Sequence, residues 1–250
     1  MGLPFFYIES IDPESPSIFL NEETSKHIVQ VLRMQNDEQL QLTDGKGNLF
    51  TAEITDNDRK KCTVALVQTS HLLPPTHNIT IAISLIKNSS RFEWFLEKAT
   101  EIGVTTILPL ICVRTEKQHF RYERMKNILV SAMLQSRQCW LPVLFEPVAF
   151  EEIWQSFESE TLAKFGTLRK LGAYQQKFIA HCLDEDKGEL TEMINGDLST
   201  KIILIGPEGD FTKEEVGMAI RHHFIPVALG KTRLRTETAG VVAASLLCLV

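Results

Sequence analysis

The chain has few cysteines, and none of them stand close together. Its 250 residues include five, an odd number, with no Cys-x-x-Cys pair; they are Cys62, Cys112, Cys139, Cys182 and Cys248. An odd, scattered set excludes a full complement of paired disulfides, and the missing Cys-x-x-Cys spacing argues against a zinc site. The composition therefore predicts a protein of the reducing cytoplasm that holds no metal.

The sequence also lacks a long hydrophobic run. No apolar stretch reaches the roughly 18 residues that a membrane span needs. The opening MGLPFFYIES lacks the basic-then-apolar order of a secretion signal. Apolar residues make up 44% of the chain and charged residues 23%, an ordinary balance for a globular protein. We expect a soluble, cytoplasmic protein without a membrane partner.

An excess of positive charge is missing too. Lysine and arginine number 26 against 32 aspartates and glutamates, a net charge of −6, which argues against a protein that coats nucleic acid. Residues 1–70 alone hold 6 basic and 11 acidic residues. Against this background, residues 114–126 carry five basic and two acidic residues, and residues 231–235 carry three basic ones and no acid. Such clusters predict a site for an anionic ligand, with solvated surface charge as the alternative.

A pair of prolines divides the chain in two. Residues 71–77 read HLLPPTH, and adjacent prolines hold the backbone extended and cannot join a central strand, so this stretch is expected to be a linker. Before it, alternating apolar residues predict β-strands and one helix is expected from Thr24. The expected strands are 39–43, 49–54 and 62–68, with a turn at 44–48. We expect a small β-rich domain at 1–72 and a second domain at 77–250.

The second domain alternates between strand and helix patterns, which predicts an α/β fold with a mostly parallel sheet. Ser90 and Glu93 have the spacing of a capping box that begins a helix, and Gly103 is expected to end it. Pro109 predicts an edge position, or the end, for the strand at 105–112. The other expected strands are 79–86, 161–165, 178–182, 201–205 and 225–229, and the other expected helices are 121–138, one from Thr212 and one from about Thr238.

Two loops of this domain follow strands and lead into helices. In an open parallel sheet, ligands bind at the carboxyl ends of the strands. The first loop, IGPEGDFT at 205–212, is neither a phosphate-binding P-loop nor a Gly-x-Gly-x-x-Gly fingerprint. It enters a helix that Thr212 is expected to cap, with Glu215 three residues on. The second, ALGKTRLRTETAG at 228–240, carries three cations. Each alone could be a simple connector, but at two strand ends that are expected to be adjacent they predict a small-molecule pocket.

These two loops resemble a known family, the ribosomal RNA small subunit methyltransferases E of the SPOUT superfamily. Three further segments agree with it in order: HIVQVLRM at 27–34, RFEWFLEKATEIGV at 91–104 and PLICVRTE at 109–116. The resemblance covers essentially the whole chain. It departs at 134–142, LQSRQCWLP, where relatives have an acid and a glycine; this leaves open whether the segment packs in a dimer or faces RNA.

The resemblance implies a PUA-like β-barrel that binds RNA at 1–72 and a SPOUT domain with a deep trefoil knot at 77–250. It implies S-adenosyl-L-methionine as the methyl donor. The substrate would be one uridine of small-subunit (16S-type) ribosomal RNA, or of the 30S particle, methylated at ring nitrogen three. A homodimer is implied as well, with each site completed near the subunit interface.

The same resemblance assigns the candidate site residues. The two loops would hold the cofactor through Leu204, Ile205, Gly206, Pro207, Glu208, Gly209, Leu229, Gly230, Leu234, Arg235, Thr236, Thr238 and Ala239. Arg235 is the first choice for stabilising charge on the base, and Glu237 is the second catalytic candidate, with capping of a helix as the alternative for Glu208 and Glu237. The residues expected to contact RNA are Arg33, Arg91, Arg114 and Arg233, and no metal ligands are expected.

Two other functions fit the sequence. The same chemistry could act on another RNA, such as transfer RNA. Alternatively, the chain could be a non-catalytic RNA-binding factor of ribosome assembly, which the altered segment at 134–142 favours and the intact loop motifs disfavour. No residue stands out as a general base.

Overall fold

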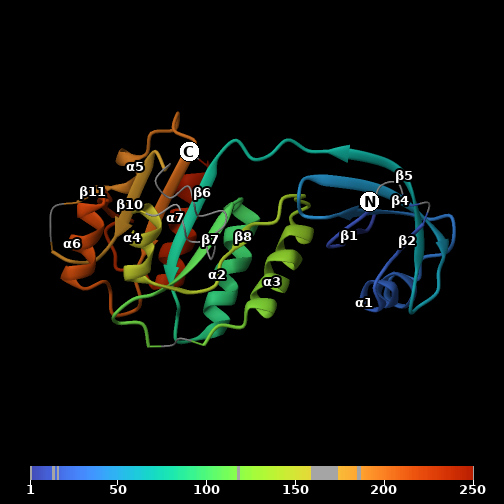
Figure 1. The fold of residues 1–250 in the computed structure, drawn as a ribbon, viewed down its shortest axis with the longest axis horizontal. Helices are drawn as coiled ribbons and strands as arrows, with labels where there is room; N and C mark the ends of the chain where they lie inside the picture. Colours follow the sequence, from blue (N-terminus) through green and yellow to red (C-terminus); the bar gives the residue numbers. More distant parts are fainter. Residues whose placement is uncertain are drawn as a thin grey trace. The chain divides into compact units, whose positions relative to one another are not determined.

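The computed structural model describes residues 2–12, 15, 17–116, 119–158, 174–184 and 187–249 (Figure 1). The chain divides into two compact units. Unit 1 comprises Met1–Pro74 together with Met133–Leu141, and unit 2 comprises Pro75–Ala132 together with Pro142–Val250. The short segment 133–141 therefore belongs with the N-terminal unit although it follows it by about sixty residues in the chain.

Unit 1 is built around a five-stranded sheet in the order β1-β3-β4-β5-β2. Its elements are β1 (Phe5–Tyr7), β2 (Ile18–Phe19), α1 (Glu22–Lys26), η1 (His27–Val31), β3 (Gln39–Thr43), β4 (Asn48–Asp56) and β5 (Thr63–His71). The alternation that predicted strands also sets the core, because Leu40, Leu42 and Phe50 point inward and are buried. The predictions of strands at 39–43, 49–54 and 62–68 are confirmed.

The expected helix from Thr24 is in fact two short helices. The side chain of Asn21 caps α1 by accepting from the backbone N–H of Thr24, so the helix begins earlier than predicted. It continues as the π-helix η1, where the N–H of Leu32 donates to the carbonyl of His27. Arg33 then turns the chain with a left-handed φ of 58°. Such wide turns depend on local packing that apolar spacing does not reveal.

Residues 133–141, the segment that departs from the family pattern, extend the turn between β3 and β4. The N–H of Gly47 donates to the carbonyl of Cys139, and the N–H of Leu141 donates to the carbonyl of Gly45, both at 2.8 Å. The indole N–H of Trp140 donates to the carbonyl of Leu73 at 3.1 Å. In unit 1 this segment therefore packs against the turn between β3 and β4 and against Leu73.

Replacing Gly47 with alanine is expected to destabilise unit 1 by roughly 2 to 4 kcal/mol. Gly47 has a left-handed φ of 90°, and an added Cβ would lie 2.4 Å from the ring of Trp140. Urea denaturation of the variant measures the loss. Gly196→Ala is the matched control, because nothing lies within 4 Å of its added Cβ; equal stability of the two variants would contradict the role given to the Gly47–Trp140 contact.

Unit 2 contains a sheet in which every described strand pair is parallel, as the alternation of strands and helices predicts. The strand order is β11-β13-β10-β12-β6-β7-β8, and β9 pairs with β7. The strands are β6 (Asn78–Ser84), β7 (Thr106–Ile111), β8 (Val143–Leu144), β9 (Val148–Ala149), β10 (Gln176–Ala180), β11 (Gly188–Glu189), β12 (Thr200–Ile205) and β13 (Ile225–Ala228).

Helices cover both faces of this sheet (Figure 1). They are α2 (Ser89–Ile102), α3 (Tyr122–Gln135), α4 (Phe150–Glu158), α5 (Leu190–Met193), α6 (Lys213–Arg221) and α7 (Thr236–Leu249). Residues of α4 and α6 pack into one core cluster with Ile202 and Leu204 of β12. On the other face α7 lies against β6 and α2, and Gly240 allows this, because an added Cβ would lie 2.7 Å from Phe95.

The start of α2 differs from the prediction. The helix is capped by Asn88, whose side chain accepts from the N–H of Ser90 at 3.0 Å, so Ser90 is inside the helix rather than at its cap. Glu93 is not part of a capping box and pairs with Arg124 instead. The end of the helix is confirmed at Gly103, which has a left-handed φ of 106°. Asparagine and serine are both good caps, and their order in the chain did not distinguish them.

Pro109 was expected to mark an edge or an end, but it lies inside β7 and pairs with Ile83 of β6. The carbonyls of Thr105 and Ile107 accept from Val143 and Phe145, so odd-numbered backbone groups of β7 face β8 and β9. Those two strands pair with β7 on either side of residue 109 and leave it uncovered. The proline therefore sits where no neighbouring strand needs its missing N–H.

Two predictions stand outside these observations. The strand expected at 161–165 lies outside the described residues, and the trefoil knot stays a prediction. Among the residues that the structure describes, no helix is long and apolar enough to cross a membrane.

Candidate functional site

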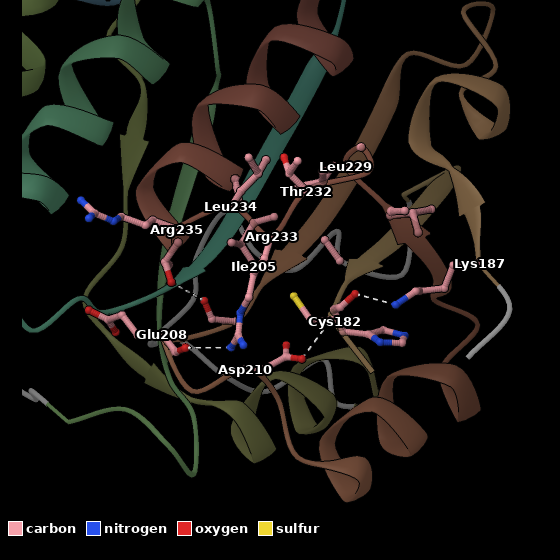
Figure 2. Close-up of a pocket in the computed structure, with 18 of the residues that line it drawn as sticks. Cys182, Lys187, Ile205, Glu208, Asp210, Leu229, Thr232, Arg233, Leu234 and Arg235 are labelled. Atoms are coloured by element: carbon pink, nitrogen blue, oxygen red, sulfur yellow. Dashed lines mark hydrogen bonds between the residues drawn. The ribbon is translucent and has the colours of Figure 1, made fainter. Parts of the chain in front are cut away.

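A cavity of about 650 Å³ opens at the carboxyl ends of the strands in unit 2 (Figure 2). Its wall comes from three places: the loop after β12, the loop after β13 with the first turn of α7, and the end of β10 with the residues that follow. The lining residues are Ala180, His181, Cys182, Lys187, Ile205, Gly206, Pro207, Glu208, Asp210, Val227, Ala228, Leu229, Gly230, Lys231, Thr232, Arg233, Leu234, Arg235, Thr236 and Ala239.

The two loops singled out in the sequence meet at this cavity. The buried hydroxyl of Thr236 donates to the carbonyl of Gly206 at 3.0 Å, and the guanidinium of Arg233 donates to the carbonyl of Glu208 at 3.4 Å. Their strands were expected to be adjacent, but β10 lies between β12 and β13. The loops therefore join above the end of β10, and this is how residues of β10 enter the site.

The loop after β12 is held in a tight turn. The N–H of Asp210 donates to the carbonyl of Pro207, and Asp210 has a left-handed φ of 65°. Its carboxylate also accepts from the backbone N–H of Cys182 at 2.8 Å, which ties this loop to the end of β10. The predicted capping box of Thr212 and Glu215 is confirmed and fixes the start of α6.

The loop after β13 reaches the cavity through a glycine. Gly230 has a left-handed φ of 120°, and nothing lies within 4 Å of the place where a Cβ would be. The helix α7 begins at Thr236, two residues before the expected start, and Thr236 uses its hydroxyl for the bond to Gly206. The conformation of this loop therefore depends on a residue without a side chain.

Ten of the thirteen residues that the family resemblance predicts to hold a cofactor line the cavity, and three do not. Leu204 points to the opposite face of the sheet and is fully buried in the core, since successive residues of a strand face opposite sides. The carbonyl of Gly209 accepts from Arg114 instead. Thr238 lies on another side of α7, because the helical period turns Thr236 and Ala239 toward the cavity and Thr238 away from it.

The residues that β10 and its end contribute to the cavity wall were not predicted from the sequence. Ala180, His181 and Cys182 line the cavity, and the amine of Lys187 holds the following turn by donating to the carbonyls of His181 and Leu183 at 2.8 and 2.6 Å. A strand had been predicted at 178–182, but its place between β12 and β13 could not be read from the chain order. Without the position of β10 in the sheet, nothing in the sequence indicates that these residues belong to the site.

The basic side chains near the two loops differ in whether a carboxylate neutralises their charge. Lys87 pairs with Glu116 at 2.7 Å, and this contact raises the pKa of the Lys87 amine. By contrast, Arg114 and Arg233 donate to main-chain carbonyls, so no carboxylate neutralises them in the contacts described. The side chain of Arg235 is exposed, and no hydrogen bond or ion pair between described residues involves its guanidinium. These three arginines are therefore available to an anionic ligand.

The remaining predicted residues lie away from the cavity wall. Glu237 is buried in the first turn of α7 and pairs with Arg91 of α2 at 3.6 Å, and it does not line the cavity. Arg33 belongs to unit 1, where it is exposed. Across the described residues, no group of three or more His, Cys, Asp or Glu side chains could hold a metal ion.

This fold and this site are those of the RNA methyltransferases. Residues 74–248 match the family described as RNA methyltransferase domain, and residues 20–67 match the one described as RNA methyltransferase PUA domain. The ribosomal RNA small subunit methyltransferase E of Synechocystis is 32% identical over 228 residues, which span 87% of this chain and 68% of that protein. The chain belongs to the ribosomal RNA small subunit methyltransferase E family.

Solved structures agree along almost the whole chain. A probable rRNA-methyltransferase from Porphyromonas gingivalis is 36% identical, with a TM-score of 0.81 over 97% of this chain and 95% of that one. A ribosomal RNA small subunit methyltransferase E from Neisseria gonorrhoeae, solved with S-adenosyl methionine bound, is 26% identical, with a TM-score of 0.80 over 98% of this chain and 96% of that one.

Proposed function

We propose that this protein transfers the methyl group of S-adenosyl-L-methionine to ring nitrogen three of one uridine in small-subunit ribosomal RNA. The observation that carries the proposal is the bond between Thr236 and Gly206, which brings the two family loops together around one cavity. Membership of the family supports the methylation of ribosomal RNA. The choice of uridine and of nitrogen three rests on the resemblance of the loops.

The cavity has the properties that such a cofactor requires. Its volume of about 650 Å³ lies within the usual range for small-molecule sites. Ile205, Leu229 and Leu234 offer apolar surface for the adenine ring, and Gly206 and Gly230 also line the cavity, with open space at Gly230 where a side chain would be. When bound, the cofactor supplies an already activated methyl group attached to a sulfonium.

The task of the protein is then to place the base and to stabilise its charge. A uridine imide is mostly protonated at neutral pH, so the reaction needs the anion of the base, whose charge spreads over the two carbonyl oxygens. A guanidinium at these oxygens stabilises that charge. Arg235 fits this role, since it lines the cavity on the side away from Lys187 and its guanidinium has no partner among the described residues (Figure 2).

The path of the RNA backbone is assigned to Arg114 and Arg233. They come from different loops and donate to the carbonyls of the adjacent residues Gly209 and Glu208, at 2.7 and 3.4 Å. Both side chains are exposed, so their remaining N–H groups can bind a phosphate. Two guanidinium groups at one turn make a clamp for the strand that carries the target.

Replacing Arg114 or Arg233 with alanine is expected to weaken RNA binding and to make it less sensitive to salt. Each phosphate contact releases counterions, so each variant should lower the slope of log K against log salt by about one. Titration of labelled RNA at several salt concentrations measures this slope. Arg221→Ala is the matched control, because it removes an exposed charge at the far end of α6; equal slopes for all three variants would contradict the clamp.

Two further parts of the proposal concern assembly. We assign RNA binding also to unit 1, where Arg33 is exposed beside the π-helix, and to Arg91. The active form is proposed to be a homodimer. Each chain is proposed to have two domains, 1–72 and 77–250, which the linker between them connects. Sedimentation of the purified protein tests the dimer.

The proposal is tested with labelled S-adenosyl-L-methionine and small ribosomal subunits from cells that lack the modification. Label should enter a single uridine, and analysis of the nucleosides should identify methylation at nitrogen three. Label found only with transfer RNA would favour the alternative substrate. If calorimetry shows no binding of S-adenosyl-L-methionine, the chain is a non-catalytic RNA-binding factor and the proposal is wrong.

A further inference from the structure

Glu237 is a buried acid whose hydrogen-bonding capacity is only partly used. Its side chain is 7% exposed, and one carboxylate oxygen lies 3.6 Å from Nε of Arg91. The other oxygen, Oε2, is buried and has no hydrogen-bond partner among the residues that the structure describes. A carboxylate only accepts hydrogen bonds, and burying one with an unused oxygen costs free energy. A fold that needed Glu237 only for packing would gain nothing from this oxygen.

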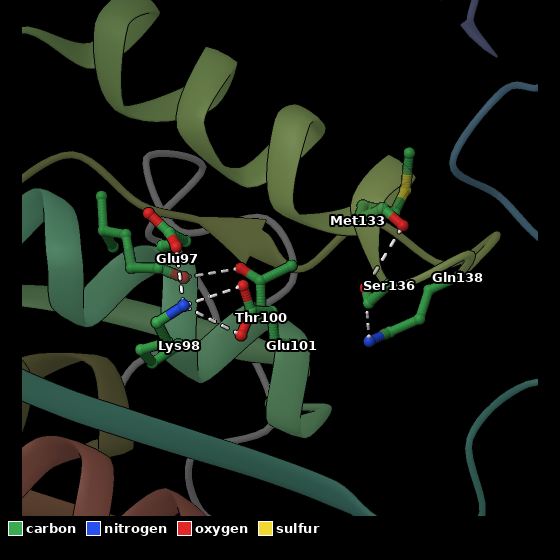
Figure 3. A network of polar contacts seen from close by, with 8 residues as sticks. Glu97, Lys98, Thr100, Glu101, Met133, Ser136 and Gln138 are labelled. Carbon is green, nitrogen blue, oxygen red and sulfur yellow. Dashed lines mark hydrogen bonds and ion pairs between the residues drawn. The ribbon is translucent and has the colours of Figure 1, made fainter. Parts of the chain in front are cut away.

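A second arginine–glutamate pair in the same unit shows what a structural contact looks like. Arg124 donates to both oxygens of Glu93, at 2.6 and 2.9 Å, in the two-pronged geometry that such pairs favour. Lys98 of α2 is likewise held firmly, between Glu97 and Glu101 (Figure 3). The contact between Arg91 and Glu237 has neither the short distance nor the second bond. Of the two arginine–glutamate pairs, the contact between Arg91 and Glu237 is therefore the one that another ligand can replace at a small cost in free energy.

The position of Glu237 excludes the cofactor as the missing donor. Thr236 and Ala239 of the same helix line the cavity, whereas Glu237 and Arg91 do not. Glu237 instead faces the beginning of α2, where the side chain of Arg91 is 41% exposed. A donor that reaches Glu237 must therefore come from the solvent side, past Arg91. On the proposed function, the ligand that arrives there is the RNA.

A uridine within an RNA strand has only two N–H or O–H donors: the ring N3–H and the ribose 2′-hydroxyl. The direction of the N3–H must be left to the incoming methyl group, so a fixed protein acceptor cannot occupy it during transfer. The 2′-hydroxyl remains. It is also the group by which a protein distinguishes RNA from DNA at a given position.

We propose that Glu237 accepts a hydrogen bond from the 2′-hydroxyl of the target uridine, which takes the place of Arg91. Arg91 then turns to the RNA, where its guanidinium pairs with a phosphate of the same strand. The exchange leaves both groups hydrogen-bonded, because the carboxylate gains the hydroxyl as a neutral donor and the arginine gains an anion. This inference rests on the proposed function and adds to it the feature of the nucleotide that the site reads.

The test compares a target uridine with a target 2′-deoxyuridine. Small subunits are reconstituted with ribosomal RNA that is ligated to carry one or the other at the position found by labelling, and methyl transfer is measured as kcat/KM. For the unmodified protein, the deoxy target is expected to be at least about tenfold poorer, the usual effect of losing a hydrogen bond to a charged group. Equal rates on the two targets would overturn the inference and leave the proposed function intact.

The same comparison is made with two variants at this position. In Glu237→Ala the acceptor is gone, so the deoxy target should be less than about twofold poorer than the ribose target; in Glu237→Gln, which keeps a neutral acceptor, the ratio should fall in between. Glu93→Gln removes a carboxylate of the other pair and should keep the full ratio. A ratio of about tenfold in Glu237→Ala would show that another group reads the hydroxyl. If no methyl enters even the ribose target, the proposed function fails and this inference with it.

Discussion

Replacing Arg235 with alanine is expected to lower kcat for methyl transfer about 100- to 1,000-fold, the usual effect of removing one group that stabilises charge in the transition state. The reason is that Arg235 lies at the edge of the cavity and is uncompensated in the described structure. The affinity for S-adenosyl-L-methionine, measured by calorimetry, should change only slightly. Arg235→Lys keeps the charge but not the planar fork, and should recover part of the rate.

A pH profile separates charge stabilisation from simple positioning. A cation beside the carbonyl oxygens favours the anionic base and so lowers the pKa of the bound imide. Without Arg235 the imide pKa is higher, and the rate of the variant should level off at a higher pH than that of the unmodified protein. Arg221→Ala, with an exposed charge removed elsewhere, should keep both the rate and the profile. A loss in Arg235→Ala of less than about threefold would contradict the assignment.

Replacing Gly230 with valine is expected to weaken the binding of S-adenosyl-L-methionine about 10- to 100-fold. Gly230 has a φ of 120°, which a β-branched residue does not adopt without strain. The loop after β13 must therefore move, and this loop supplies a large part of the cavity wall, from Leu229 to Thr236. Calorimetric titration measures the loss.

The control for this variant is another glycine of unit 2. Gly217 lies within α6, and only the end of the Arg221 side chain lies near its added Cβ, at 3.7 Å. Gly217→Ala should keep the cofactor affinity and stabilise the helix slightly, since alanine favours helix. If Gly230→Val bound the cofactor as tightly as Gly217→Ala, the loop would not shape the site and the role of the cavity would have to be revised.

Both the Arg235 and the Gly230 predictions depend on the hydrogen bonds that join the two loops. Thr236 donates to Gly206 across thirty residues of chain, and Arg233 donates to Glu208. Arg235, between these two donors, is therefore carried on a segment that is fixed to the first loop at both sides. The main chain that carries this guanidinium is therefore already in place before the base arrives, and only the side chain has to be ordered to stabilise the transition state.

Much of the fold was predicted from the sequence because it depends on neighbouring residues. Apolar patterns predicted the longer strands of both units but not the short β1, β2, β8, β9 and β11, and the spacing of Thr212 and Glu215 predicted the start of α6. Gly103 marked the end of α2 because only glycine takes its conformation easily. Such signals act over two to four residues, and their physics is the same wherever the segment lies in the molecule.

The predictions that differed from the structure depended on distant contacts. Pro109 is tolerated inside the sheet because β8 and β9 leave a gap beside it, and segment 133–141 joins unit 1 because Cys139 and Leu141 bond to the turn of the first sheet. Neither partner can be recognised from the residues next to these positions. In both cases the sequence shows the local pattern of the segment but not the part of the chain against which it packs.

By itself, the amino-acid sequence determined the alternation of strands and helices, the two loops at the strand ends and the family to which they point. Only the tertiary structure decided that β10 lies between β12 and β13, that Leu204 faces the core, and that Arg91 meets Glu237. The physical reason is that turns, caps and periodicity follow from local backbone conformation, whereas these contacts depend on the order in which distant strands and helices pack together.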